Sequence, residues 1–330
     1  MDNSVLLKIE NLRKHYQLRD KAKGRRILRA VDGVSLDINR GETFGLVGES
    51  GCGKTTLGRT ILRLAEPDGG SIIFDGKDIT RVNMRPYRSR MQIIFQNPSG
   101  CLDPRSRIKD IVAEGIRTKS PGVSGAQRNE RIISLLESVG LDEYSAHRYP
   151  HEFSGGQQQR VGIARALAVE PEFIVCDEPL SALDVSYQAQ LINLLKELQD
   201  KLGLTYLFIS HDMSVVRYVS DRVGVMYLGK LVESGRCEDV IQSPAHQYTK
   251  ALIEAVPIPD PIAGRAKDRK LPEEYADLVI PEKGCRYCRL CKAAQSDCFE
   301  IEPEMIEISP GHFCACHFPN YCAENKPECT

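Results

Sequence analysis

The chain has 330 residues, 42% of them hydrophobic, and a formal net charge of −1 from 44 basic and 45 acidic side chains. This composition predicts one large core with a smaller appendage. The balanced charge gives no general field for nucleic acid, so DNA and RNA are not expected as partners. No apolar run reaches the roughly eighteen residues of a membrane helix, and the first residues lack the regions of a signal peptide. We therefore expect a soluble, cytosolic protein.

Early in the chain, the pattern predicts antiparallel strands. Val34, Leu36 and Ile38 alternate with polar residues, which is typical of a half-buried strand. The apolar residues 72–74 with the turn Asp75-Gly76 indicate a hairpin. Upstream of both, the basic segment 19–26 is interpreted as a solvated hairpin tip in preference to a partner-binding patch.

A glycine-rich loop at 48–55 follows a predicted buried strand at 43–47 and precedes a predicted helix at 56–62, and it matches G-x-x-x-x-G-K-[ST] in full. Its glycines allow successive N–H groups to converge on phosphates. Lys54 would bridge the β- and γ-phosphates, and the Thr55 hydroxyl would ligate Mg²⁺. The alternative, a turn that matches by chance, is disfavoured by both flanks. The predicted nucleotide-binding residues are Gly48, Ser50, Gly51, Cys52, Gly53, Lys54, Thr55 and Thr56.

A second phosphate-binding feature is predicted where a helix should begin. Ser154, Gly155, Gly156 and Gln157 precede the apolar-periodic run 161–169. A helix N-terminus carries free N–H groups and the positive end of a dipole, so it suits an anion. The two glycines let a phosphate approach those amides without a Cβ in the way.

An acidic strand end follows, in which the apolar residues 173–176 lead to Asp177 and Glu178. This pattern favours a central parallel strand whose charged end lies at the ligand crevice. Asp177 is placed to hold Mg²⁺, directly or through water, and Glu178 to polarise the water that attacks the γ-phosphate. The alternative is a strand that simply stops at solvent-facing acids. The segment 181–184, Ser-Ala-Leu-Asp, favours the functional interpretation.

Together these residues resemble the ATP-binding cassette (ABC) ATPases, over roughly residues 5–257. The resemblance implies an α/β P-loop NTPase fold with a mixed β core, an antiparallel β-subdomain and a helical subdomain at about 97–170. It also implies that Gln96 contacts Mg²⁺ or the attacking water, that His211 touches the γ-phosphate and that Tyr16 stacks on adenine. Judged alone, such a tyrosine or histidine is more often structural.

The same resemblance implies a shared catalytic site. Lys54 and Ser154 lie too far apart in this fold to reach one nucleotide, so two cassettes must meet head to tail, with the segment 181–184 along their interface. ATP closes the pair and hydrolysis opens it. The implied partners are a second ATPase subunit, two transmembrane permease subunits docked near Gln96 and the helical subdomain, and indirectly an extracytoplasmic solute-binding protein. The chain would then lie peripherally on the cytoplasmic face of the membrane.

Three segments narrow the resemblance further. Residues 96–98, 101–105 and 246–252 are similar to the ATPase subunits of oligopeptide and dipeptide importers, a group with nickel-importing members. Residues 14–16 and 58–64 favour the F-type of the two ATPases that such importers use. The transported solute is not indicated, because cargo does not touch this subunit. The alternatives are a nickel importer, a soluble iron–sulfur ABC ATPase not tied to transport, a DNA-repair cassette and a redox sensor without activity.

Beyond the predicted cassette at 1–257, the chain changes character. Five prolines between residues 257 and 281 punctuate a charged stretch, and we interpret residues 258–284 as a linker. A cysteine-rich domain is predicted at 285–330. In a reducing compartment, metal ligation is favoured over disulfides. Eight of the twelve cysteines lie there: Cys285, Cys288, Cys291, Cys298, Cys314, Cys316, Cys322 and Cys329.

The spacing of these cysteines leaves the ligand set open. The first three resemble the start of a ferredoxin run, although the next cysteine comes seven residues later instead of four, and paired zinc knuckles are absent. The resemblance to the importer family implies that Cys285, Cys291, Cys298 and Cys316 hold a structural [4Fe–4S] cluster. Zinc, or free or disulfide-bonded cysteines, are the alternatives. Nothing in the tail places it beside Lys54 or Glu178, so we expect ATP hydrolysis to survive its loss.

Overall fold

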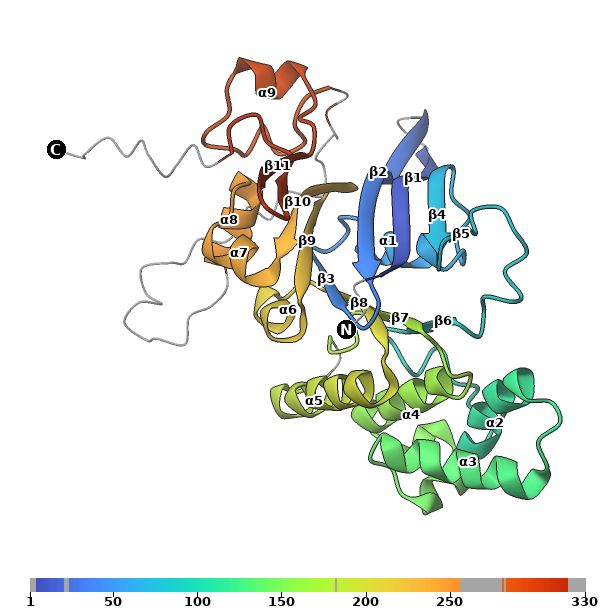
Figure 1. Ribbon diagram of the computed structural model, residues 1–330. Helices are drawn as coiled ribbons and strands as arrows, with labels where there is room; N and C mark the ends of the chain where they lie inside the picture. Colours follow the sequence, from blue (N-terminus) through green and yellow to red (C-terminus); the bar gives the residue numbers. More distant parts are fainter. Residues whose placement is uncertain (1–3, 21–23, 182, 256–280, 282, 320–330) are drawn as a thin grey trace, which may run out of the picture.

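The computed structural model describes residues 4–20, 24–181, 183–255, 281 and 283–319. Most of the linker predicted at 258–284 therefore lies outside the described residues. Two sheets lie side by side, a group of helices lies against one end of the larger sheet, and the cysteine-rich tail lies at the other end, beside α7 and α8 (Figure 1).

The smaller sheet is antiparallel, as predicted, with the strand order β2-β1-β4-β5. Its long hairpin is built from β1 (Val5–Asp20) and β2 (Gly24–Asn39), followed by β4 (Gly69–Phe74) and β5 (Lys77–Asp78). Val34, Leu36 and Ile38 are buried, which agrees with their alternation in the sequence. Of the basic segment 19–26, Arg19 and Asp20 of β1 lie opposite Arg25 and Gly24 of β2 in the register of the hairpin, and residues 21–23 lie outside the described residues.

The larger sheet has the strand order β11-β12-β10-β9-β3-β8-β7-β6. Its parallel part consists of β3 (Thr43–Val47), β6 (Met91–Ile94), β7 (Phe173–Asp177), β8 (Thr205–Ser210) and β9 (Arg222–Tyr227). Every residue of β3, β7 and β8 is buried, because other layers cover both faces of these strands. Their carboxyl ends point to the same edge of the sheet and position the site described below.

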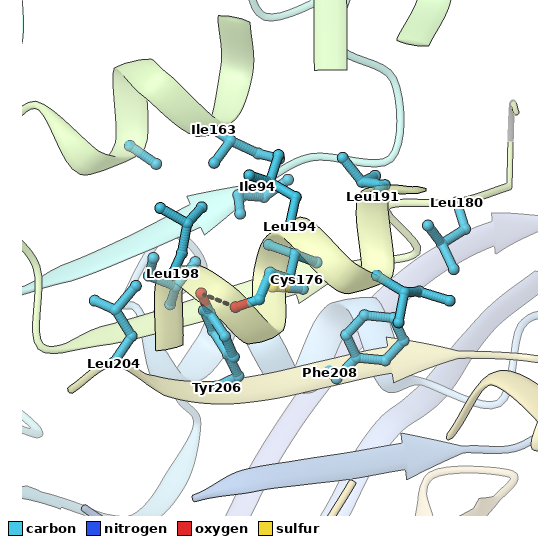
Figure 2. Packing of buried hydrophobic residues seen from close by; sticks show 14 of the residues in the cluster. Ile94, Ile163, Cys176, Leu180, Leu191, Leu194, Leu198, Leu204, Tyr206 and Phe208 are labelled. Carbon is cyan, nitrogen blue, oxygen red and sulfur yellow. Dashed lines mark hydrogen bonds between the residues drawn. The ribbon is translucent and has the colours of Figure 1, made fainter. Parts of the chain in front are cut away.

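Five helices follow the strands of this sheet. They are α1 (Lys54–Ile61), α5 (Val185–Leu202), α6 (Met213–Val219), α7 (Cys237–Gln242) and α8 (Gln247–Glu254). Figure 2 shows Leu194 and Leu198 of α5 against Cys176 of β7 and Tyr206 of β8. The Tyr206 hydroxyl donates a hydrogen bond of 3.1 Å to the carbonyl oxygen of Leu195, so its polar atom is satisfied inside the apolar layer.

The helical group falls within the range predicted as the helical subdomain. It contains α2 (Ile108–Lys119), α3 (Gly125–Ser138), the 3₁₀ turns η1 (Glu143–His147) and η2 (Pro150–Glu152), and α4 (Gly155–Leu167). The buried Gln159 of α4 donates from Nε2 to the carbonyl oxygen of Phe95, over 3.3 Å. This bond joins the helical group to the chain directly before Gln96.

The described part of the tail continues the central sheet, where we expected a separate appendage. It contains α9 (Ser296–Glu300), β11 (Ile306–Ser309) and β12 (His312–Cys314), and β12 pairs with β10 (Lys230–Arg236). This pairing satisfies backbone groups that β10 would otherwise leave at a sheet edge. The buried Glu233 accepts a 2.8 Å hydrogen bond from His312 Nε2 and two more from the backbone of Ala245 and His246. The proposed domain boundaries stay a prediction.

Candidate active site

The glycine-rich loop connects β3 to α1, and its backbone requires its glycines. Gly48, Gly51 and Gly53 have φ angles of 156°, 81° and 108°. A Cβ at Gly48 would lie 2.1 Å from the carbonyl oxygen of Met226, and one at Gly53 would lie 2.0 Å from that of Ala30. No side chain fits at either position, so the loop can keep its amides turned inward only with glycine.

The end of this loop is joined to β7 by a hydrogen bond, in which Thr55 Oγ1 donates to Asp177 Oδ1 over 2.7 Å. Burial raises the pKa of Asp177, whereas the bond from Thr55 opposes that rise. Lys54 is buried beside them and donates to the carbonyl oxygens of Gly48 and Glu49, over 2.7 and 2.8 Å. A hydroxyl and a carboxylate in contact are oxygen ligands of the kind that Mg²⁺ takes.

Glu178, the residue after Asp177, meets two residues that follow other strands of the sheet. Gln96 Nε2 donates to Glu178 Oε2 over 2.9 Å, and His211 Nδ1 lies 3.4 Å from the same oxygen. Glu178 has a φ of 45°, and its amide donates to the carbonyl oxygen of Ile209 over 3.1 Å. The turn after β7 therefore aims this carboxylate toward the residues that follow β6 and β8.

Residues 51–56 and Glu178 line a pocket of about 240 Å³ together with Tyr16, which is 39% exposed. The rest of the pocket wall was not predicted from the sequence, because no motif marks its residues. They are Leu28, Arg29, Ala30, Leu228 and Gly229. Leu228 and Gly229 form the turn between β9 and β10, with φ angles of 42° and 86°. The glycine at this turn was the only available signal.

The predicted residues of the α4 start lie elsewhere. Ser154 Oγ accepts from the Gln157 amide over 3.3 Å, and Gln157 Oε1 accepts from the Ser154 amide over 3.1 Å, a reciprocal cap that satisfies both donors. Ser154 and Gly155 are exposed. Within the described chain, residues 154–157 do not line the pocket that holds Lys54, and Figure 1 places α4 in the helical group, apart from α1.

Five of the tail cysteines line one small cavity, together with His246 and Tyr287: Cys285, Cys288, Cys291, Cys298 and Cys316. Burial raises the pKa of Cys285 to about 12. The described residues include no group of three or more His, Cys, Asp or Glu side chains arranged to hold a metal ion. The predicted iron–sulfur cluster therefore has no direct support in this structure. Cys322 and Cys329 lie outside the described residues.

Comparison with known families and proteins agrees with the cassette fold and its site. The ABC transporter family model matches residues 31–181, and the model of the oligopeptide/dipeptide transporter C-terminal region matches residues 232–298. A putative peptide import ATP-binding protein of Brucella ovis is 50% identical over 319 residues, 96% of this chain and 98% of that protein. The oligopeptide transport ATP-binding protein OppF of Bacillus subtilis is 47% identical over 315 residues, 94% and 96% of the two chains.

Solved structures show the same fold. The ATP-binding cassette MJ0796, in a dimeric post-hydrolysis state bound to ADP and phosphate, is 30% identical with a TM-score of 0.64, over 70% of this chain and 99% of that one. CbiO1 from Clostridium perfringens is 29% identical with a TM-score of 0.62, over 72% and 91%. The predicted P-loop ABC cassette is thereby confirmed, and with it ATP hydrolysis as the activity.

The chain belongs to the ABC transporter ATPases of the oligopeptide/dipeptide family. Among the residues that the structure describes, no helix combines the length and the apolar character needed to cross a membrane.

Proposed function

We propose that this protein is the ATP-hydrolysing subunit of a peptide importer and that it is the F-type subunit. Support comes from relatives that cover nearly the whole chain and are named for peptide import or oligopeptide transport. The match of the C-terminal region supports the same family. Its partners are a second ATPase subunit and two permease subunits, at the cytoplasmic face of the membrane, and it serves a solute-binding protein indirectly.

Each residue of the site then has a role. Lys54 binds the β- and γ-phosphates, Thr55 and Asp177 hold Mg²⁺ with Gln96 beside them, and Mg²⁺ neutralises charge on the phosphate oxygens when bound. Glu178 takes a proton from the attacking water. His211 contacts the γ-phosphate, as its 3.4 Å approach to Glu178 permits.

The observation that carries the mechanism is a separation within one chain. Lys54, Asp177 and Glu178 gather at one edge of the sheet, whereas the exposed Ser154 caps a helix of the helical group. A second cassette, placed head to tail, completes the site with its own residues 154–157. Tyr16 stacks on adenine at the other end of the pocket. Closure on ATP and opening after hydrolysis then move the permeases.

An uptake experiment tests the cargo. Cells that produce only the Lys54→Ala variant should lose accumulation of radiolabelled di- and oligopeptides, because ATP no longer binds productively. Lys77→Ala, at an exposed position, is the matched control. Peptide uptake that survives Lys54→Ala, together with a loss of nickel uptake, would assign the chain to the nickel-importing members instead.

We further propose that Cys285, Cys291, Cys298 and Cys316 hold a [4Fe–4S] cluster, with zinc as the alternative metal. These four cysteines line the same cavity, and four thiolates are what such a cluster needs. When bound, the cluster would cross-link the loops of a tail that is near the size at which metals are usually needed for folding. Its role is then structural.

Anaerobic purification tests the cluster. Brown protein with about four irons and four sulfides per chain is expected. Cys298→Ser and Cys316→Ser should remove the colour, whereas Cys314→Ser should keep it, because Cys314 does not line the cavity. Cys288 does line it, so loss of colour in Cys288→Ser alone would move the ligand set to the ferredoxin-like run. Colourless protein with stoichiometric zinc would replace the cluster by zinc.

A further inference from the structure

Two consecutive tail residues reach from the cysteine cavity to the back of the nucleotide pocket. Arg286 and Tyr287 stand between Cys285 and Cys288. The guanidinium of Arg286, whose side chain is only 7% exposed, donates to the carboxylate of Asp32 and to the carbonyl oxygen of Leu228. From the sequence, nothing placed the tail beside the active site. In the structure, Arg286 of the tail contacts Leu228, which lines the nucleotide pocket.

The contacts of Arg286 lead to the wall of the pocket near Tyr16, because Asp32 Oδ1 lies 3.4 Å from Nε2 of His15, the residue before Tyr16. The Asp32 amide donates to the carbonyl oxygen of Gly229 over 2.9 Å, and the Gly229 amide donates to the carbonyl oxygen of Cys52, in the phosphate-binding loop, over 2.7 Å. A Cβ at Gly229 would lie 2.5 Å from the carbonyl oxygen of Arg29 and 3.1 Å from Arg286 Nη1. This wall is therefore closely packed from the tail to the loop.

Tyr287 reaches the phosphate side by a separate route. Its ring centroid lies 5.3 Å from that of Tyr227 and 5.5 Å from that of Tyr248. The Tyr248 hydroxyl accepts a 2.9 Å hydrogen bond from the amide of Glu49, in the phosphate-binding loop. The tail thus reaches the base side through Arg286, and it reaches the phosphate-binding loop through Tyr287 and the intervening Tyr248.

The charges around Arg286 make this contact costly to remove. Burial alone would raise the pKa of Asp32, but Arg286, Lys230 and Arg29 hold that pKa below its ordinary value. The Asp32 carboxylate is therefore ionised at neutral pH. Without Arg286 it would keep its charge in a half-buried position with a weaker set of partners, and such a charge moves or draws in water.

We propose that Arg286 is a positioning residue for the base side of the ATP site. It holds the turn 228–229 and Asp32 against the phosphate-binding loop, so the tail sets how tightly its own chain binds the adenosine part of ATP. The inference rests on the nucleotide site of the proposed function and not on what occupies the cysteine cavity. The expectation that ATP hydrolysis survives loss of the tail stays a prediction, to which the proposal adds an effect of the tail on ATP affinity.

Calorimetry on the full chain, with ATP and with inorganic triphosphate as separate probes, tests the proposal. Arg286→Met should weaken ATP binding about fivefold to tenfold, a usual size for coupling between sites. Inorganic triphosphate, which contacts the phosphate-binding loop alone, should lose clearly less affinity than ATP does, because the turn 228–229 reaches that loop through a single backbone hydrogen bond to Cys52. Arg286→Lys should recover part of the ATP affinity. The matched control is Arg289→Met, because Arg289 is exposed in the same loop.

Tyr248→Phe provides the contrasting pattern. It removes the acceptor of the Glu49 amide, so both probes should lose affinity together. Equal losses for both probes in Arg286→Met, or a lower melting temperature with unchanged ATP affinity, would overturn the positioning role. Should Arg286→Met fail to fold, Asp32→Ala removes the acceptor of the same pair from the other side and carries the same expectation. Absence of ATP binding by the wild type would instead overturn the nucleotide site itself.

Discussion

Replacing Glu178 by glutamine changes the reaction and leaves the shape of the site nearly intact. The carboxylate lies at the end of β7, 2.9 Å from Gln96 Nε2 and 3.4 Å from His211 Nδ1. Glutamine has the same length, and its amide oxygen can still accept from Gln96. What the substitution removes is the ability to take a proton from water.

Loss of the general base and the weaker hydrogen bond from Gln96 differ greatly in their energetic cost. A general base contributes about 10² to 10⁴ in rate, which corresponds to a barrier roughly 3 to 5 kcal/mol lower. The hydrogen bond from Gln96 changes from one that accepts at a charged group to a neutral one, a loss of about 1 kcal/mol. We therefore expect Glu178→Gln to lower turnover at least a hundredfold while ATP affinity changes by no more than about fivefold.

Phosphate release measures turnover, calorimetry with ATP measures affinity, and gel filtration in ATP reports the dimer. Turnover should fall, and the variant should elute as a stable dimer, because ATP closes the pair and hydrolysis no longer opens it. Glu170→Gln is the matched control, since it makes the same chemical change at an exposed position shortly before β7. Unchanged turnover in Glu178→Gln would remove this carboxylate from the chemistry. A drop in affinity as large as the drop in turnover would indicate a distorted pocket instead.

Two further predictions concern the start of α4. Lys54→Ala and Ser154→Arg should each abolish turnover. Mixing the two variants should restore one working site in each heterodimer. Heterodimers that form without regaining ATPase activity would contradict the shared site. Gly156→Ala should lower the free energy of unfolding in urea by about 1 to 3 kcal/mol, because its Cβ would lie 2.6 Å from the Tyr187 ring. Gly155→Ala should lower the free energy of unfolding less, because a Cβ at Gly155 would have no atom within 4 Å. Equal losses of stability in the two variants would mean that α4 and α5 move apart freely.

Local chemistry made much of this protein predictable from its sequence. The glycines of the loop, Lys54 and Thr55 are neighbours along the chain, so their spacing already implies converging amides and a cation beside them. Asp177 and Glu178 end an apolar run, and in a parallel sheet a strand end is a ligand edge. The positions of Gln96 and His211 became meaningful through resemblance to a family, since neither residue is marked by its own neighbours.

Contacts between distant segments were decided only by the tertiary structure. Arg29 and Leu228 line the pocket because β2 and the β9–β10 turn meet above the loop, and no periodicity encodes that meeting. The tail was expected to be an appendage, yet β12 completes the edge of β10, where unpaired backbone groups accept any strand of suitable register. In another part of the same tail, Arg286 contacts Asp32, 254 residues earlier in the chain. The spacing of residues within one segment determines which ligand groups that segment can bind. Tertiary packing decides which distant segments lie close enough to bind the same ligand.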